Sequence, residues 1–166
     1  MYLLLMFLFL PETSFGTKCG GFLTSPRGVI STPNFPNLFD TPIHCKWTID
    51  NQNFPESWIA VYLTQVYVTE GLTFTENYSN YVKKVIYKAK EENIDTNYHV
   101  LSNSEQLEIT LDLVNTEGTH LRVLDHLLDV YGFNITYEIT ELEYVRNESC
   151  TAWRCGFNGH CYDHFT

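Results

Sequence analysis

Three cysteines and two histidines crowd one short stretch of the sequence, as Cys150, Cys155, His160, Cys161 and His164. Cysteine and histidine are the usual ligands of tetrahedral zinc, so the last four of these residues could hold a metal ion. Their spacing fits no standard zinc finger, and such sites belong mostly to reducing compartments. In an oxidising compartment the same cysteines form disulfides. A thiol or an intermolecular bridge at Cys155 is a third possibility, because the chain contains five cysteines in all.

The beginning of the sequence indicates the compartment. Residues 1–10 are an unbroken apolar run that is too short to span a bilayer, and polar residues follow it. We expect residues 1–16 to be a secretory signal peptide, although no positive charge precedes the run; the alternative is a buried N-terminal strand or helix. Three glycosylation sequons, at Asn77, Asn134 and Asn147, agree with a secreted protein or one on the extracellular face of the plasma membrane.

Composition narrows the function classes. The 166 residues are enough for one domain, and the formal net charge of −10 argues against binding nucleic acid. No second long apolar run is present, so we expect no direct membrane insertion by this chain. The sequence contains no nucleophile elbow, no His-Glu-x-x-His and no phosphate-binding glycine loop, which predicts a protein that is not an enzyme.

The elements that position the cysteines and sequons are predicted strands. Four segments, 44–50, 58–68, 106–114 and 132–139, alternate apolar and polar residues with the period of two that a half-buried strand requires. Strands with one apolar face and no long helices predict an all-β protein with two packed sheets. The expected inward-facing residues are Cys45, Trp47, Ile49, Ile59, Val61, Leu63, Leu107, Ile109, Leu111, Leu113, Phe133, Ile135, Tyr137 and Ile139. The same alternation places Asn134 on an outer face, where a glycan has room.

The remaining segments are polar or ambiguous. Residues 88–98 are predicted to be a loop, and the leucine spacing in 120–130 favours a short helical excursion. A polar connector follows Glu143, so we place a domain boundary there. Prolines 33 and 36 predict an extended segment with few ladder hydrogen bonds, and Gly28 is expected in a turn that favours positive φ.

The beginning of this β-rich region resembles the CUB domain family. The motifs that carry the resemblance are Cys19–Gly21, Gly28–Ile30, Thr32–Pro36 and Cys45–Ile49, and Gly132–Phe133 is similar to the start of the family's last strand. The resemblance covers residues 19–140 and implies a jelly-roll β-sandwich. A disulfide between Cys19 and Cys45 would close a loop of about 27 residues and stabilise the fold by roughly 3–4 kcal/mol in the chain-entropy account.

The middle of the chain departs from the family pattern. The second cysteine pair of most CUB domains is missing, and residues 70–80 replace the usual Tyr-Asp motif. Many members bind calcium through one Glu and two Asp residues. Here Glu70 matches the Glu and either Asp125 or Asp129 stands near the second Asp, but the first Asp has no counterpart. We therefore predict no metal and no cofactor, with a calcium site as the open alternative.

The terminal cysteines resemble the start of an EGF-like module, which implies a linker at 141–149 and a partial module at 150–166. By position, the resemblance pairs Cys150 with Cys161 and leaves Cys155 without its partner in this chain. The expectation that follows is an N-terminal piece of a longer extracellular protein, similar to attractin-like or multiple-EGF proteins.

Together these features predict a non-catalytic module that recognises extracellular proteins or glycans. Loops at the ends of the sandwich carry the candidate contact residues Tyr78, Tyr81 and His120. One alternative is the targeting region of a longer CUB/EGF protease. Another is a complete, stand-alone secreted CUB protein.

Overall fold

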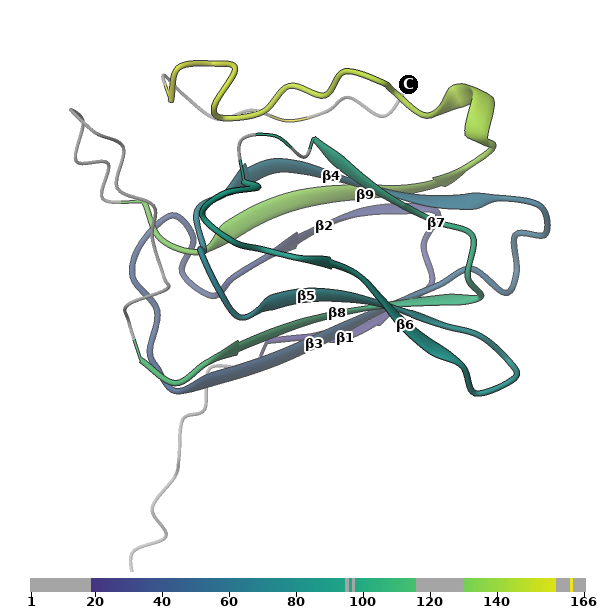
Figure 1. The fold of residues 1–166 in the computed structure, drawn as a ribbon, viewed down its shortest axis with the longest axis horizontal. Coiled ribbons are helices and arrows are strands. Elements are labelled where there is room, and N and C mark those ends of the chain that lie inside the picture. The colour runs from purple at the N-terminus through teal and green to yellow at the C-terminus, as the bar shows by residue number, and fades with distance from the viewer. Residues whose placement is uncertain (1–18, 95, 97, 116–129, 158–161, 163–166) are drawn as a thin grey trace, which may run out of the picture.

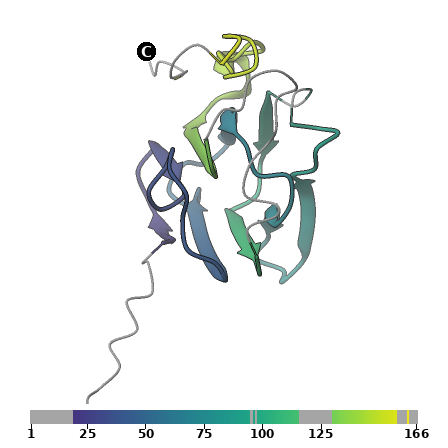
Figure 2. The same cartoon turned by 90° about the vertical axis from the view of Figure 1, so that its left-hand side faces the viewer.

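The computed structural model describes residues 19–94, 96, 98–115, 130–157 and 162. These residues form two stacked β-sheets, a five-stranded sheet in the order β1-β3-β8-β5-β6 and a four-stranded sheet in the order β2-β9-β4-β7 (Figures 1 and 2). The predicted all-β, two-sheet sandwich is confirmed. The elements are β1 (Gly21–Leu23), β2 (Arg27–Ser31), β3 (Ile43–Asp50), β4 (Trp58–Val66), β5 (Leu72–Asn77), β6 (Lys83–Lys88), β7 (His99–Ser102), β8 (Gln106–Leu113), β9 (Phe133–Thr140) and the 3-10 helix η1 (Leu142–Tyr144).

The core lies between the two sheets and follows the predicted alternation. Strands β3 and β8 pair antiparallel, with Cys45 opposite Leu111 and Trp47 opposite Ile109. These four side chains are buried, and Phe133 of β9 packs edge-on against Trp47 from the opposite sheet, with 5.6 Å between ring centroids. Because burying one such side chain stabilises a fold by about 1.5–3 kcal/mol, the alternating strands supply most of the driving force for stacking the sheets.

The predicted disulfide between Cys19 and Cys45 is present and joins the start of the described chain to the core strand β3. Its Cα atoms are 5.2 Å apart. Strand β1 follows at once and pairs parallel to β3, with Gly21 opposite Trp47. Gly20 has φ of +98° and lies directly against the backbone carbonyl of Lys46, where a side chain would clash. The cysteine and the glycine therefore dock the first strand together.

Two details of the opening motif differ from the expectation. Gly28 lies inside β2 rather than in a turn, and an added Cβ would come within 2.7 Å of the Tyr137 ring. Its role is to let β2 approach β9 closely. The proline segment makes turns rather than an extended chain, with hydrogen bonds from the N–H of Phe35 to the carbonyl of Thr32 and from that of Asn37 to Asn34. It does lie outside both sheets, as its missing donors predicted.

Strand β4 is buried on both of its faces. Ile59, Val61 and Leu63 point into the core as predicted. Ala60 and Tyr62 point to the other side of the sheet and are buried as well, in a small second cluster with Val145. The expected solvent-facing side of this strand therefore meets another part of the chain instead of water.

The chain after β9 provides that cover. Residues 145–157, which we call the cover segment, run along the outer side of the four-stranded sheet (Figure 1). The N–H of Ala152 donates to the carbonyl of Thr64 over 2.6 Å, and the hydroxyl of Ser149 donates to that of Tyr98 over 3.1 Å. The guanidinium of Arg154 stacks on the Tyr98 ring at 4.4 Å. The polar connector expected after Glu143 therefore leads into a segment that packs against the sandwich.

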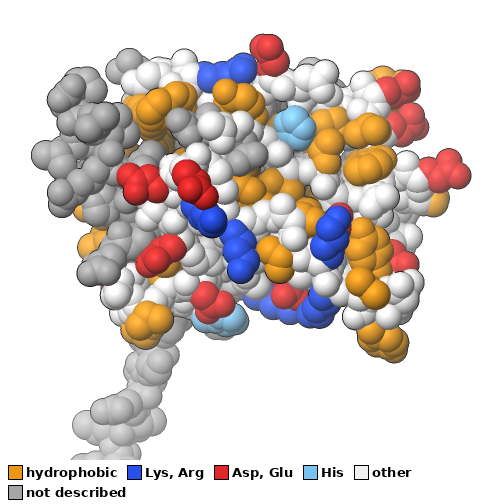
Figure 3. Space-filling model, in the orientation of Figure 1, with side chains coloured by type: hydrophobic (Ala, Val, Ile, Leu, Met, Phe, Trp, Pro, Cys, Tyr) orange, Lys and Arg blue, Asp and Glu red, His pale blue; other side chains and the backbone are white. Residues whose placement is uncertain are grey.

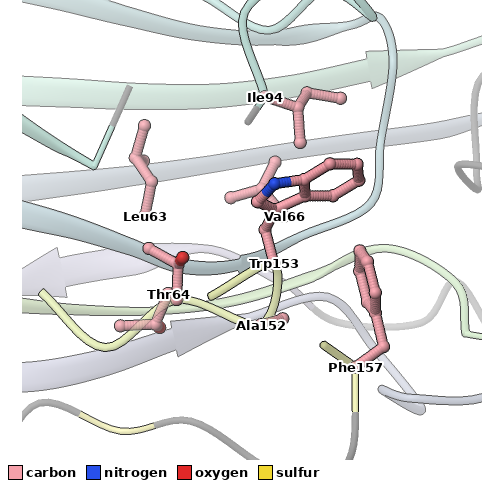
Figure 4. Close-up of a pocket in the computed structure, with 8 residues that line it drawn as sticks. Leu63, Thr64, Val66, Ile94, Ala152, Trp153 and Phe157 are labelled. Carbon is pink, nitrogen blue, oxygen red and sulfur yellow. The ribbon is translucent and has the colours of Figure 1, made fainter. Parts of the chain in front are cut away.

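The contact between the cover segment and β4 is well filled. Figure 4 shows Trp153 beside Val66 and Ile94. The space left between the cover segment and the sheet is about 10 Å³, roughly the room of one water molecule. Phe157 extends the contact by meeting Tyr67, with ring centroids 6.0 Å apart. This seam is therefore packing rather than a ligand cavity.

Candidate functional site

The predicted contact residues Tyr78 and Tyr81 lie together beside an open pocket on the five-stranded sheet. The pocket has a volume of about 480 Å³, and we call it the hairpin pocket because the β5–β6 hairpin forms one side of it. Its lining residues are Lys46, Asn77, Tyr78, Tyr81, Val82, Lys83, Gln106 and Glu108. His120, the third predicted contact residue, lies outside the described residues.

The hairpin turn positions the tyrosines. The N–H of Tyr78 donates to the carbonyl of Val82, and the N–H of Tyr81 donates to that of Tyr78. Tyr81 has a φ of +63°, in the left-handed region, and its side chain is 96% exposed. An exposed aromatic on a hydrogen-bonded turn loses little further conformational freedom when it meets a partner, which favours binding.

Three charged groups lie in the floor of the pocket. The ammonium group of Lys46 on β3 forms a close ion pair with the Glu108 carboxylate on β8, and the ammonium of Lys83 lies 3.9 Å from the same carboxylate. Burial alone would raise the pKa of Glu108, but Lys46, Lys83 and the Asn77 side chain together hold that pKa below its ordinary value. Glu108 is therefore ionised at neutral pH, and one negative charge faces two positive ones.

A buried polar cluster supports the hairpin from the other side of β5. The hydroxyl of Ser102 on β7 donates to the carboxylate of Glu76 over 2.9 Å, and the two residues belong to different sheets. Burial, together with the neighbouring Glu76 carboxylate, raises the pKa of Tyr78. The Tyr78 phenol therefore stays protonated at neutral pH, and it donates to Asn103 over 3.4 Å.

The sequence placed the pocket's charged residues on outward faces without bringing them together. Lys46 and Glu108 both alternate outward in predicted strands, but only the pairing of β3 with β8 makes them neighbours. Lys83 lies on β6, a strand that the sequence pattern did not predict because its apolar residues do not alternate cleanly. A run of two lysines after an aromatic-rich turn was the available signal.

The three sequons occupy very different environments. Asn147 is exposed and Asn77 is half-buried at the end of β5. Asn134 lies on the outer side of β9 as predicted, but it is only 7% exposed and its side-chain amide donates to Gln65 over 3.1 Å. The Asn134 side chain is therefore engaged with β4 and largely shielded from solvent, and glycosylation there stays a prediction.

The terminal cysteines also differ from the EGF-like expectation. Cys155 is disulfide-bonded, and its sulfur lies 3.2 Å from that of Cys150. The expectation that Cys155 lacks a partner in this chain is therefore wrong, whereas the pairing of Cys150 with Cys161 stays a prediction. A turn closed by the N–H of Cys155 on the Thr151 carbonyl brings the two sulfurs together, which a pairing inferred by position does not anticipate. Cys161, the predicted partner of Cys150, is not among the described residues.

The predicted alternatives that involve metals find limited support. Glu70 is exposed in the loop between β4 and β5, while Asp125 and Asp129 lie in the part of the chain that the structure does not describe. Among the described residues, no three His, Cys, Asp or Glu side chains gather in a way that could hold a metal ion. The zinc alternative rests on His160, Cys161 and His164, which are likewise outside the described ranges, so both metal sites stay untested.

Comparisons with known proteins agree with the fold. The sequence model of the CUB domain matches residues 19–137. The cubilin homolog of Drosophila melanogaster is 32% identical over 139 residues, which is 83% of this chain and 3% of that protein. Rat cubilin is 53% identical over 38 residues, which is 23% of this chain and 1% of that protein. The chain thus spans only a few per cent of the curated relatives it matches.

A solved structure extends the agreement to three dimensions. The CUB1-EGF-CUB2 domain of human MASP-1/3 superimposes with a TM-score of 0.54 at 15% identity, covering 74% of this chain and 43% of that one. At this identity the likeness concerns the fold.

In the described ranges of this chain, no helix has the length and apolar character needed to cross a membrane.

Proposed function

The chain belongs to the CUB domain family, and from this premise we propose that it is an extracellular recognition module that binds another protein through the hairpin pocket and the turn beside it. CUB domains are extracellular interaction modules without catalytic activity of their own. The observation that carries the proposal is Tyr81, an almost fully exposed aromatic on an ordered turn next to an open pocket. Exposed tyrosines at concave sites are enriched among the residues that dominate protein interfaces.

The pocket has the surroundings that a protein interface requires. Val82 is about half exposed, lines the pocket with Tyr81 and supplies an apolar centre. Lys46 and Lys83, which also line the pocket, provide polar groups beside this apolar centre. Figure 3 shows lysine and arginine side chains at the lower edge of the molecule, where the five-stranded sheet lies in Figure 1.

Secretion is part of the same proposal. The disulfide between Cys19 and Cys45 supports an oxidising compartment. The signal peptide, the glycans at Asn77 and Asn147 and an EGF-like module beginning at Cys150 are predictions that agree with it. A glycan on Asn77 would stand at the hairpin pocket and regulate access to it, since Asn77 lines that pocket.

The test is binding of the secreted chain, as a dimeric antibody-Fc fusion, to an array of purified extracellular ectodomains. Tyr81→Ser is expected to weaken each specific interaction by about thirtyfold, the effect of removing an interface hot spot. The matched control is Val29→Ser on β2, since Val29 is also exposed but lies on the other sheet. Specific binding that survives Tyr81→Ser unchanged would place the interface elsewhere and overturn the proposal.

Glycan control of the pocket is tested in the same assay. Ser79→Ala removes the sequon at Asn77 without touching the Asn77 side chain, and Ser79 is exposed. Binding is expected to increase if the purified protein carries a glycan there. A glycosylated protein that binds as well as its Ser79→Ala variant would show that the glycan points away from the interface.

A further inference from the structure

We propose that the hairpin pocket binds the carboxylate of an Asp or Glu side chain on a protein partner, with Lys83 as the group that receives it. This inference rests on the proposed function, because it names the chemistry of the partner at the same site. It begins from the charge balance in the pocket. Lys46 and Lys83 share a single carboxylate, that of Glu108, so one further anionic group would balance the second positive charge.

The two lysines differ in how fully they are paired. Lys46 forms the close ion pair with Glu108, whereas the ammonium of Lys83 stays 3.9 Å from the same carboxylate. The Lys83 side chain is also 64% exposed. An ammonium that is loosely paired and half in water gives up little when a second carboxylate approaches, so Lys83 is the receiving group.

The surrounding groups favour a carboxylate on a peptide over a sulfated glycan. A sulfated chain binds through an array of cations, but two lysines are the cations among the described residues that line the pocket. Instead, the apolar side chains of Val82 and Tyr81 adjoin them, which suits the neighbouring residues of a peptide. Gln106 adds an amide that can hydrogen-bond to a carboxylate or to a peptide backbone.

The position on the sheet also favours an extended partner. Strand β6 is the last strand of the five-stranded sheet, so its outer edge faces away from β5. Lys83 stands at the first position of β6, opposite Asn77. A peptide that lies along this edge can place one acidic side chain over Lys83 while its backbone follows the strand.

Glu108 sets the affinity of the site. It competes with the ligand for both ammonium groups, and its lowered pKa keeps it charged at neutral pH. Replacing Glu108 with glutamine therefore strengthens binding of a carboxylate ligand. A residue with a merely structural role would have the opposite effect or none.

The test is a titration of the full chain, 15N-labelled and bearing Ser79→Ala, followed by amide chemical shifts. The probe is the peptide acetyl-Gly-Val-Glu-Val-Gly-amide, and its glutamine counterpart is the neutral control. We expect shifts at Tyr81, Lys83 and Glu108 with a dissociation constant of about 1 mM, and none with the neutral peptide. Lys83→Gln should weaken binding about tenfold, the effect of losing one charge-assisted hydrogen bond.

The matched control is Lys88→Gln, which removes the same charge from the same strand outside the pocket. It should change the affinity by less than about twofold. Equal weakening by both variants would reveal an unspecific charge effect and overturn the inference. So would a heparin tetrasaccharide that shifts the pocket resonances when the acidic peptide does not. If the peptide fails while ectodomain binding still depends on Tyr81, the inference is wrong and the proposed function stands.

Discussion

The two outer faces of this sandwich are built from similar strands but end in different environments. The outer face of the five-stranded sheet is open and bears ion pairs such as Lys46 with Glu108 and His44 with Asp112. The outer face of the four-stranded sheet lies beneath the cover segment, where Tyr62, Thr64 and Asn134 are buried. One face is thus available to partners, and the other is used inside the molecule.

The difference between the two faces shows what the outer face of a sheet needs in order to be buried. A buried polar group costs free energy unless it is hydrogen-bonded, so a covered face needs a matched cover. The cover segment meets this need, because Thr64 receives the N–H of Ala152 and Tyr62 receives that of Arg146. Among the described residues, the outer face of the five-stranded sheet has no such cover segment.

Among the changes that test the covered face, ending the chain after Thr140 should have the largest effect on the free energy of unfolding. This removes the cover segment and exposes Ala60 and Tyr62 to water. We expect the free energy of unfolding to fall by about 4 kcal/mol, from lost burial of Val145 and Ala152 and from lost hydrogen bonds. Chemical denaturation of the two chains measures the difference.

Truncation also removes cysteines, so a full-length variant is needed as its control. Ala152→Glu puts a charge at a site that is 4% exposed and should destabilise the fold by more than about 2 kcal/mol. The exposed neighbour Glu148→Gln should stay within about 0.5 kcal/mol. If the truncated chain and Ala152→Glu both unfold like the parent, residues 145–157 are a linker and not a cover.

A smaller effect is expected from Tyr62→Phe, which removes one hydroxyl beneath the cover segment. That hydroxyl donates to Glu138 over 2.5 Å and accepts the Arg146 N–H over 3.2 Å. Leaving these groups without a partner should cost about 1–2 kcal/mol of unfolding free energy. Tyr144→Phe, at an exposed tyrosine of the same region, should cost nothing measurable. Equal effects at both sites would mean that the hydroxyl contact does not hold the cover.

The smallest effect on the free energy of unfolding is expected on the open face of the five-stranded sheet, at Glu108. The folded-state pKa of Glu108 lies below its unfolded value of 4.5, so its charge stabilises the fold above that pH, and this contribution is lost as pH falls through the folded pKa. Because Lys46 and Lys83 are largely solvated, we expect less than about 1 kcal/mol. Unfolding free energies from pH 7 down to about pH 3 should therefore fall slightly less for Glu108→Gln than for the parent. A steeper fall in the variant would contradict the assigned direction.

The sequence predicted the core well because alternation reports burial on one face. Leu107, Ile109 and Leu111 are buried as expected. The bridge between Cys19 and Cys45 was expected from the resemblance to the CUB family and is present. Tyr78 and Tyr81, the contact residues predicted from the sequence, lie together at the hairpin pocket, and their contact with a partner stays a prediction.

The rest depended on contacts between distant segments. Alternation could not indicate that Tyr62 is buried, since its cover comes from residues 145–157. The pair of Lys46 with Glu108 required the register of β3 against β8, which no local pattern encodes. The sulfur contact between Cys150 and Cys155 is a different case, because it comes from a local turn that the resemblance did not imply.

Hydrogen exchange of residues 145–157 tests most directly whether one face is covered and the other open. The N–H of Ala152, which donates to Thr64, should exchange at least about a thousandfold more slowly than in an unfolded chain, as expected for a segment held by about 4 kcal/mol. Amides of the exposed turn at Ser79 and Asn80 provide the fast reference in the same experiment. Exchange of Ala152 at the rate of that turn would contradict the account, because the four-stranded sheet would then be as open as the other.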